Sequence, residues 1–336
     1  MALEHYLVIG SEGFLGSYLV DALLERKCII RCFDITQRKT WPACVEFMAG
    51  DLCNPSHIEQ ALNGITTVFL AASPMHDASR DVLFKVNVQG VETVLQACIR
   101  LNIPRLVYTG SAIGYFSRES VRNLSEAAKP KVELMPDYAL SKHLGETMVL
   151  SANCASFSTC SLRLFALVGA GDRQISPPIF AAHRQGLSWA AVGNNKNLYD
   201  FTHIKDATQA HLLAADKLAA APETVKGHAF FITGGTPVPF FNFVRKLIYH
   251  ADQSESFNVH IPVPLAKLCA HVITPVRDAL FPATCWSFTP FAIDNVASEV
   301  YFDISKARTL LGYRPTHSLD DAAKATAKAY VLAQNS

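Results

Sequence analysis

The segment 136–146 contains two residue types that together suit acid–base chemistry. Tyr138 and Lys142 are four positions apart, so on a helix their side chains would lie one turn apart on the same face. A phenol with an ordinary pKa of about 10 transfers protons poorly at neutral pH, but a nearby ammonium stabilises its phenolate. Such a pair also occurs on ordinary solvated helices, so the surrounding elements must decide between the two interpretations.

A glycine-rich turn lies close to the N-terminus. An apolar strand over 5–10 leads into Gly10-x-x-Gly13-x-x-Gly16, and a helical pattern follows. Backbone without side chains lets a pyrophosphate approach, and a helix N-terminus offers free N–H groups and the positive end of a dipole. The spacing differs from the commoner Gly-x-Gly-x-x-Gly, yet its strand and helix context predicts nucleotide binding by Gly10, Gly13, Phe14, Leu15 and Gly16.

The second strand, over 28–33, bears on the choice of cofactor. It ends at Asp34, whose carboxylate can accept hydrogen bonds from the adenosine ribose hydroxyls and would repel a 2′-phosphate. We therefore predict NAD. Arg38 and Lys39 lie nearby in sequence and keep NADP as the alternative, and a simple strand-end turn residue is the other interpretation of Asp34.

Further strands over 45–48, 66–71 and 105–109 alternate with helices over about 56–62 and 80–101. This alternation predicts an α/β fold with a Rossmann-type, doubly wound parallel sheet. Ligands of such sheets collect at the carboxyl ends of the strands. We therefore expect additional cofactor contacts there from Ala71, Ala72, Ser73 and Thr109.

Ser111 ends the strand that we place immediately before the helix of Tyr138 and Lys142. A hydroxyl at this position can hydrogen-bond a substrate carbonyl. A routine capping or turn serine is the competing interpretation, and the Tyr–Lys pair favours the catalytic one. The predicted catalytic residues are Ser111, Tyr138 and Lys142.

Composition limits the partners and the compartment. A formal net charge of +1 on 336 residues gives no electrostatic footprint for nucleic acid, so we predict an apolar small-molecule substrate instead. Nine scattered cysteines without a Cys-x-x-Cys pair favour reduced thiols over disulfides, and we predict no metal site. We find no signal peptide or membrane span and expect a cytoplasmic protein. The interrupted apolar segment 261–283 suggests peripheral contact with an intracellular membrane, and a homodimer is a further expectation.

The ordered set of motifs resembles the extended short-chain dehydrogenase/reductases. It comprises Gly10-x-x-Gly13-x-x-Gly16, Asp34, Asp51-Leu52, Asn87-Val-x-Gly90, Thr109-Gly-Ser111-Ala112 and Tyr138-x-x-x-Lys142. Downstream segments narrow the resemblance to the 3β-hydroxysteroid dehydrogenase branch, with sterol-4α-carboxylate 3-dehydrogenases the nearest group. These segments are Ser161-Leu-Arg163, Val168-Gly-Ala-Gly-Asp172, 193–206, Phe230-Phe-Ile-Thr-Gly and 303–313.

The resemblance implies further cofactor contacts from Asp51, Leu52, Asn87, Leu164, Tyr138 and Lys142. It also implies roles for three residues in the reaction. Tyr138 would exchange a proton with the substrate oxygen, Lys142 would lower the pKa of Tyr138 and bind the nicotinamide ribose, and Ser111 would orient the carbonyl. The chain departs from the family pattern at two positions, because Gly110 stands where a second serine is usual and Leu164 where a proline is usual. We interpret both departures as signs of a specialised substrate.

The resemblance also implies two parts, a Rossmann domain (1–175 and 200–236) and a substrate-binding lobe (176–199 and 237–336). Seven aromatic residues suit a lid over a large apolar substrate, with packing in the lobe core as the equal alternative: Phe240, Phe241, Phe243, Phe281, Trp286, Phe288 and Phe291. We predict an NAD(P)-dependent oxidoreductase that interconverts a secondary alcohol and a ketone on a sterol-like, terpenoid or polyketide skeleton. A non-redox isomerase, epimerase or lyase that uses Tyr138, and a nucleotide-sensing regulatory protein, are the alternatives.

Overall fold

The computed structural model describes residues 4–116, 120–257, 259–280 and 290–334. Its centre is a seven-stranded parallel sheet in the order β12-β7-β5-β4-β1-β2-β3. Because the chain winds outward from β1 in both directions, the predicted doubly wound sheet is confirmed. The strands span His5–Ile9 (β1), Ile29–Asp34 (β2), Val45–Ala49 (β3), Thr67–Leu70 (β4), Arg105–Ser111 (β5), Ser158–Leu164 (β7) and Ala229–Ile232 (β12).

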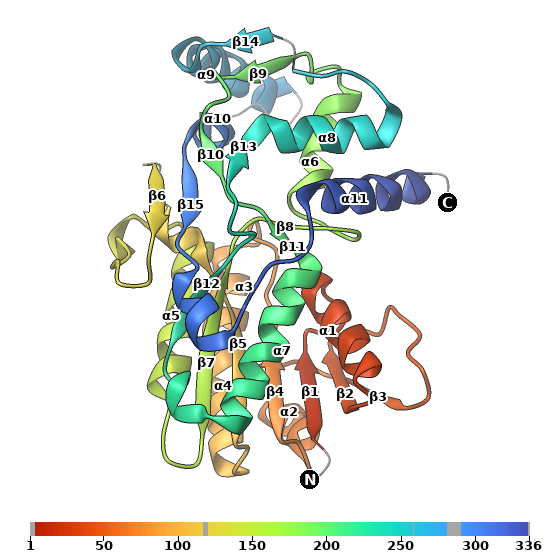
Figure 1. The fold of residues 1–336 in the computed structure, drawn as a ribbon, viewed down its shortest axis with the longest axis vertical. Coiled ribbons are helices and arrows are strands. Elements are labelled where there is room, and N and C mark those ends of the chain that lie inside the picture. Colours follow the sequence, from red (N-terminus) through yellow and green to blue (C-terminus); the bar gives the residue numbers. More distant parts are fainter. Residues whose placement is uncertain (1–3, 117–119, 258, 281–289, 335–336) are drawn as a thin grey trace.

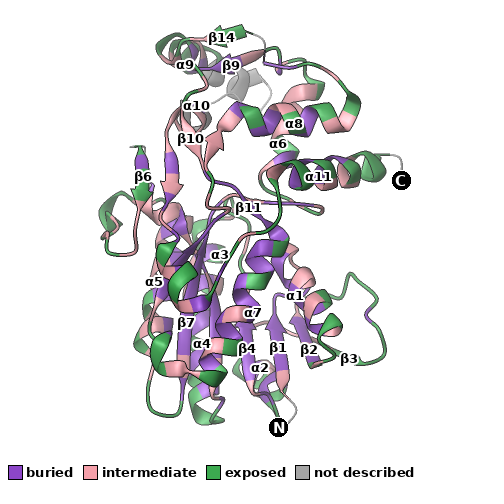
Figure 2. Ribbon diagram, in the orientation of Figure 1, coloured by how far each residue is buried: buried purple, intermediate pink, exposed green. Residues whose placement is uncertain are grey.

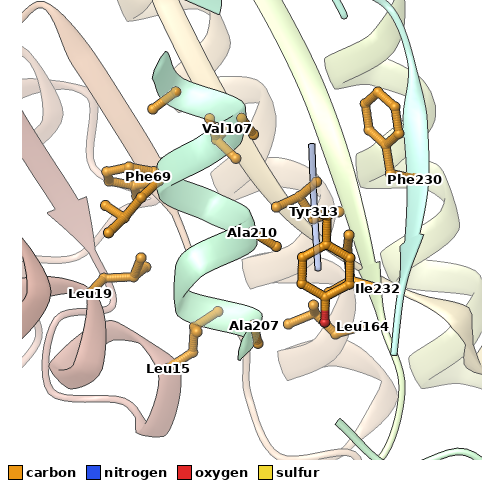
Figure 3. Packing of buried hydrophobic residues seen from close by; sticks show 14 of the residues in the cluster. Leu15, Leu19, Phe69, Val107, Leu164, Ala207, Ala210, Phe230, Ile232 and Tyr313 are labelled. Carbon is orange, nitrogen blue, oxygen red and sulfur yellow. The ribbon is translucent and has the colours of Figure 1, made fainter. Parts of the chain in front are cut away.

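Helices cover both faces of this sheet because successive side chains of each buried strand point to opposite faces. Tyr6 and Val8 of β1 pack in the core beneath α1 and α7, whereas Leu7 and Ile9 pack beneath α2, α4 and α5. Figure 3 shows the core on the α1 and α7 side of the sheet, where apolar side chains surround α7. The helices span Phe14–Glu25 (α1), Pro55–Leu62 (α2), Arg80–Phe84 (α3), Val91–Arg100 (α4), Asp137–Ser151 (α5) and Ile204–Ala220 (α7).

The helix predicted over 80–101 is divided, because a π-helical turn at Lys85–Gly90 separates α3 from α4. The packing here is very tight, since a Cβ at Gly90 would lie 2.3 Å from the Leu52 side chain. Sequence periodicity cannot show this inserted turn, because the apolar pattern on either side of it still fits a helix.

A smaller lobe lies beyond the carboxyl ends of the seven strands (Figure 1). Its helices span Ser176–Arg184 (α6), Phe240–Asp252 (α8), Val263–Leu280 (α9), Pro290–Ala297 (α10) and Leu319–Gln334 (α11). Short strands outside the large sheet pair in the orders β13-β10-β15-β6, β11-β8 and β14-β9. They span Val121–Leu124 (β6), Leu167–Val168 (β8), Ala190–Val192 (β9), Leu198–Tyr199 (β10), Thr202–His203 (β11), Val238–Pro239 (β13), Val259–Ile261 (β14) and Val300–Phe302 (β15).

One expectation about a connection needs correction, and the structure decides between the two alternatives for the lobe aromatics that it describes. Ser111 does not come immediately before α5, because residues 112–136 intervene and place β6 beside β15. Phe241 and Phe243 do not line a lid, since they are buried in the lobe core among other apolar side chains. Phe281, Trp286 and Phe288 lie outside the described residues, and the side chain of Phe291 is not described either.

The described cysteines and helices can be compared with the expectations of reduced thiols and of no membrane span. Eight cysteines are free thiols, and those at 32, 98 and 160 are buried. Among the residues that the structure describes, no helix is both long and apolar enough to cross a membrane.

Candidate active site

The glycine turn is built by close approach of three backbone segments. Gly10 has a φ of +89°, and a Cβ on it would lie 2.6 Å from the backbone nitrogen of Ala72. A Cβ on Gly16 would lie 1.9 Å from the carbonyl oxygen of Gly10. Gly13 precedes α1 without a side-chain cap, so N–H groups of the first turn remain available to an anionic ligand. Leu15 contributes only backbone here, because its side chain is buried in the core.

Asp34 is fixed at the end of β2 by backbone donors. Its carboxylate accepts hydrogen bonds from the N–H groups of Glu12 at 2.9 Å and Ile35 at 2.8 Å. A carboxylate has about four acceptor positions, so it keeps lone pairs for ribose hydroxyls. The structure thereby links the predicted ribose acceptor directly to the glycine turn.

Glu12 is a site residue that the sequence did not reveal. It is buried, and its carboxylate accepts hydrogen bonds from the N–H groups of Arg38 and Lys39, both at 2.9 Å, and from the Trp41 indole at 2.7 Å. The loop after β2 is therefore held against the glycine turn. Lys39 forms an ion pair with Asp21, with Nζ 2.9 Å from a carboxylate oxygen, so its charge is directed away from a position beside Asp34.

Some of the remaining predicted cofactor residues lie at the carboxyl edge of the sheet, and others are packed against neighbouring elements. Ala71, Ala72 and Ser73 follow β4, and Phe14 is half-buried at the start of α1. Asp51 accepts a hydrogen bond from the Cys53 N–H, which lowers the pKa of its carboxyl. Three other predicted residues are placed in packed positions instead of at an open edge: Leu52 against Gly90, Asn87 donating to the Ser141 hydroxyl at 3.0 Å, and Leu164 buried at the end of β7.

Lys142 joins α5 to the strand that carries Ser111. It is buried, its Nζ donates to the Thr109 carbonyl oxygen at 2.7 Å, and it lies 4.3 Å above the centre of the Tyr108 ring. Because Tyr138 is one turn earlier on α5, this bond places the phenol at the carboxyl end of β5. The Ser111 hydroxyl accepts the Ile113 N–H at 3.3 Å, and within the described structure it makes no hydrogen bond with Tyr138.

The pKa shifts differ from the predicted simple pairing. Burial raises the pKa of Tyr138 above its usual value, and a hydrogen bond with Ser73 opposes this shift. Burial lowers the pKa of Lys142 to about 7, and the Glu146 carboxylate opposes that shift. In this structure burial is the largest influence on the pKa of Tyr138, and the Lys142 ammonium donates to the Thr109 carbonyl oxygen. The predicted effect of Lys142 on the phenol stays a prediction.

His211 is another residue that sequence reasoning missed. It is fully buried on α7, where Nδ1 lies 2.8 Å from the Ala207 carbonyl oxygen and Nε2 lies 3.0 Å from the Thr109 hydroxyl. A carbonyl only accepts, so Nδ1 carries the proton and Nε2 accepts from Thr109. Burial lowers the pKa of His211 to about 4, which keeps it neutral. The imidazole thus fixes the residue that binds Lys142, although no sequence spacing links the two.

Solved structures share this architecture. The enzyme WbmH of Bordetella bronchiseptica, in complex with NAD+, aligns with a TM-score of 0.76 at 18% identity over 98% of each chain. The UDP-glucuronic acid 4-epimerase of Bacillus cereus, in complex with NAD, aligns with a TM-score of 0.75 at 19% identity, over 99% of this chain and all of that chain. At such identities the likeness establishes the fold.

Sequence relatives are closer. The decarboxylating sterol-4-alpha-carboxylate 3-dehydrogenase of Schizosaccharomyces pombe is 34% identical over 97% of both chains. The human protein of the same name is 32% identical over 96% of this chain and 87% of its own length. Residues 7–263 match the 3-beta hydroxysteroid dehydrogenase/isomerase family model. The predicted family is thereby confirmed, and the chain belongs to the 3-beta hydroxysteroid dehydrogenase/isomerase family.

Proposed function

We propose that this dehydrogenase uses NAD to oxidise the 3-hydroxyl of a sterol that carries a 4-carboxylate, and that the resulting ketone then loses CO2. The observation that carries the proposal is the bond from Lys142 to the Thr109 carbonyl, which brings Tyr138 to the strand end of Ser111. The names of the relatives with about one-third identity support the substrate class.

The described residues fit a bound NAD molecule. The turn at Gly10 and Gly16 is a cradle that any Cβ would fill, and it opens onto the uncapped N-terminus of α1, which favours a pyrophosphate. Asp34 would accept the ribose hydroxyls, while the Lys39–Asp21 ion pair removes one cation that a 2′-phosphate would need. The remaining contacts would come from the predicted residues of the sheet edge.

Two side chains would act at the substrate oxygen, and a third would act through one of them. The bound nicotinamide supplies a hydride acceptor for the alcohol carbon. Tyr138 would take the hydroxyl proton as the phenolate and become the neutral phenol, Ser111 would donate a hydrogen bond to the same oxygen, and the Lys142 ammonium would stabilise the phenolate. The half-buried position of Tyr138 limits access of water to the proton transfer.

Loss of CO2 follows from the chemistry of the oxidised product. A 3-ketone beside a 4-carboxylate is a β-keto acid, so the bond from C4 to the carboxyl carbon can break with its electron pair moving toward the ketone oxygen. Ser111 and Tyr138 would stabilise the enolate oxygen by hydrogen bonds, and C4 then takes a proton. The same two residues therefore serve both steps.

We propose that the chain is divided into a Rossmann part (1–175 and 200–236) and a substrate lobe (176–199 and 237–336).

We also propose that the tip of this lobe contacts a membrane. Leu265, Leu268 and Val272 of α9 are 51%, 63% and 61% exposed, whereas Ala266 and Ala270 pack inward. Figure 2 shows the exposed surface of α9 at this tip. The homodimer stays a prediction.

The test is turnover of a substrate panel by the purified protein with NAD. We expect NADH formation and stoichiometric CO2 release from a 4-carboxy-3-hydroxysterol, and neither from a UDP-sugar. Turnover of UDP-glucose alone would overturn the proposal in favour of the epimerase class. Product formation without net NADH would favour the non-redox alternative.

A further inference from the structure

A third charged residue continues the face of α5 that carries Tyr138 and Lys142. Glu146 lies one helical turn after Lys142 and is 5% exposed. Its carboxylate accepts the Ser161 hydroxyl at 2.6 Å, and it accepts Arg163 Nη2 at 2.6 Å and Nε at 2.9 Å. Such charge-assisted, forked bonding fixes both oxygens of the carboxylate.

Gly110 provides the space for this network. It lies opposite Arg163 in the pairing of β5 with β7. A Cβ on Gly110 would lie 2.5 Å from the Ser161 hydroxyl oxygen and 2.8 Å from a Glu146 carboxylate oxygen. The serine that the family pattern has at this position would therefore displace the network. In this chain the neighbouring strand supplies the hydroxyl instead, so the departure at Gly110 has a physical reason.

Lys142 needs a nearby anion because it is almost completely buried. Two described ionisable side chains act on its ammonium: Tyr108 from β5, whose ring it contacts, and Glu146 from its own helix. Tyr138 lies one turn earlier on that helix, and Arg163 from β7 forms an ion pair with Glu146. Glu146 is the charged group whose field raises the pKa of Lys142 against the effect of burial.

We propose that Glu146 is a positioning residue that keeps the buried Lys142 in its ammonium form, and that Ser161, Arg163 and the absent side chain at Gly110 fix Glu146 for this purpose. Arg163 does not cancel the effect, since the Glu146 carboxylate raises the pKa of Lys142 while it is paired with Arg163. The inference concerns the protein's own residues and does not depend on the identity of the substrate.

The direct test is an NMR titration of lysines labelled with carbon-13 at Cε, in the protein without added ligands and with Lys142→Arg to assign the signal. In Glu146→Gln we expect the titration midpoint of Lys142 to fall by about one pH unit. Glu92→Gln removes an exposed helical carboxylate and is the matched control, with an unchanged midpoint. An unchanged midpoint in Glu146→Gln would overturn the proposal.

A double variant keeps the test valid if Glu146→Gln fails to fold, because that change leaves Arg163 buried without its partner. Glu146→Gln with Arg163→Met removes both charges. Its Lys142 midpoint should also fall. If the double variant titrates like the unchanged protein, the ion pair is only a neutral scaffold and the proposal is wrong.

The activity profile adds a readout that a purely structural role would not give. In Glu146→Gln, kcat/KM with NAD should be near normal at low pH and about tenfold reduced at high pH, because the ammonium is lost earlier as pH rises. Glu146→Asp should restore part of the loss. An equal reduction at every pH would contradict the proposal. If no sterol acid is turned over at all, the proposed function fails, and the NMR titration still decides the role of Glu146.

Discussion

The carboxyl edge of the large sheet and the tip of the lobe differ in how tightly their residues are packed. At the sheet edge the backbones approach so closely that Gly16 has no room for a methyl group, and Lys142 is buried with its donor engaged. At the tip, Leu268 and Val272 of α9 remain more than half exposed. Chemistry that needs fixed distances is thus placed where packing leaves no freedom, while the surface with room to change is suited to contact with a partner.

The largest effect should come from Tyr138→Phe, which would establish the sheet edge as the reacting region. Loss of the hydroxyl proposed to carry the substrate proton should reduce kcat about a thousandfold, with NAD affinity nearly unchanged. Stopped-flow turnover and calorimetry would measure the two quantities. Lys142→Ala is the informative companion and should damage both. A variant that keeps most of its kcat would remove Tyr138 from the mechanism.

Gly16→Ala should show how little freedom the sheet edge has. The added methyl group would lie 1.9 Å from the Gly10 carbonyl oxygen, so the turn must open. We expect NAD affinity to fall about a hundredfold and the free energy of unfolding to drop by about 1–3 kcal/mol. Ser17→Ala on the same helix is the control and should do neither. Calorimetric titration with NAD that gives equal affinity in both variants would argue against this cradle.

The buried His211 should make the same region sensitive to acid. The folded protein holds this imidazole neutral with a pKa of about 4, whereas an unfolded histidine titrates near about 6.5. The unfolded state therefore binds the proton first as pH falls, and stability that is complete above about pH 6.5 is lost toward pH 4. Urea unfolding should show a loss on the order of 2–3 kcal/mol from His211 between about pH 7 and about pH 4.5. His211→Gln should lack this component, and an equally steep acid loss in that variant would refute the assignment.

The smallest effect is expected at the lobe tip. Leu268→Ser removes one exposed apolar side chain, so binding to phospholipid vesicles in a sedimentation assay should weaken a few-fold, by roughly 1 kcal/mol. The melting temperature and turnover of a detergent-dispersed substrate should not change. Lys324→Ser on the exposed side of α11 is the comparison. If the unchanged protein does not bind vesicles, the proposed membrane contact of α9 is wrong.

The sequence predicted best those features whose residues lie close together along the chain. The strand, glycine turn and helix over 5–16 lie within a dozen residues, and their pattern predicted the structure found there. The division of the 80–101 helix was not predictable, and the sequence left a lid and a lobe core as equal alternatives for Phe241 and Phe243, because both features depend on neighbours from distant segments. Glu146 carried one usable signal that was overlooked, since it repeats the four-residue spacing from Tyr138 through Lys142.

The sequence by itself determined the family and the alternation of strands with helices that forms the doubly wound sheet, and it predicted the residues of the proposed site. These follow from periodicity and from motifs whose members are close together along the chain. Only the tertiary structure decided which charged groups lie beside each buried side chain. The pairing of β5 with β7 places Gly110 beside Ser161 and Arg163, and packing of α5 on that pair brings in Glu146. The physical reason is that desolvation and Coulomb energies depend on distances between segments, which no spacing along a single chain specifies.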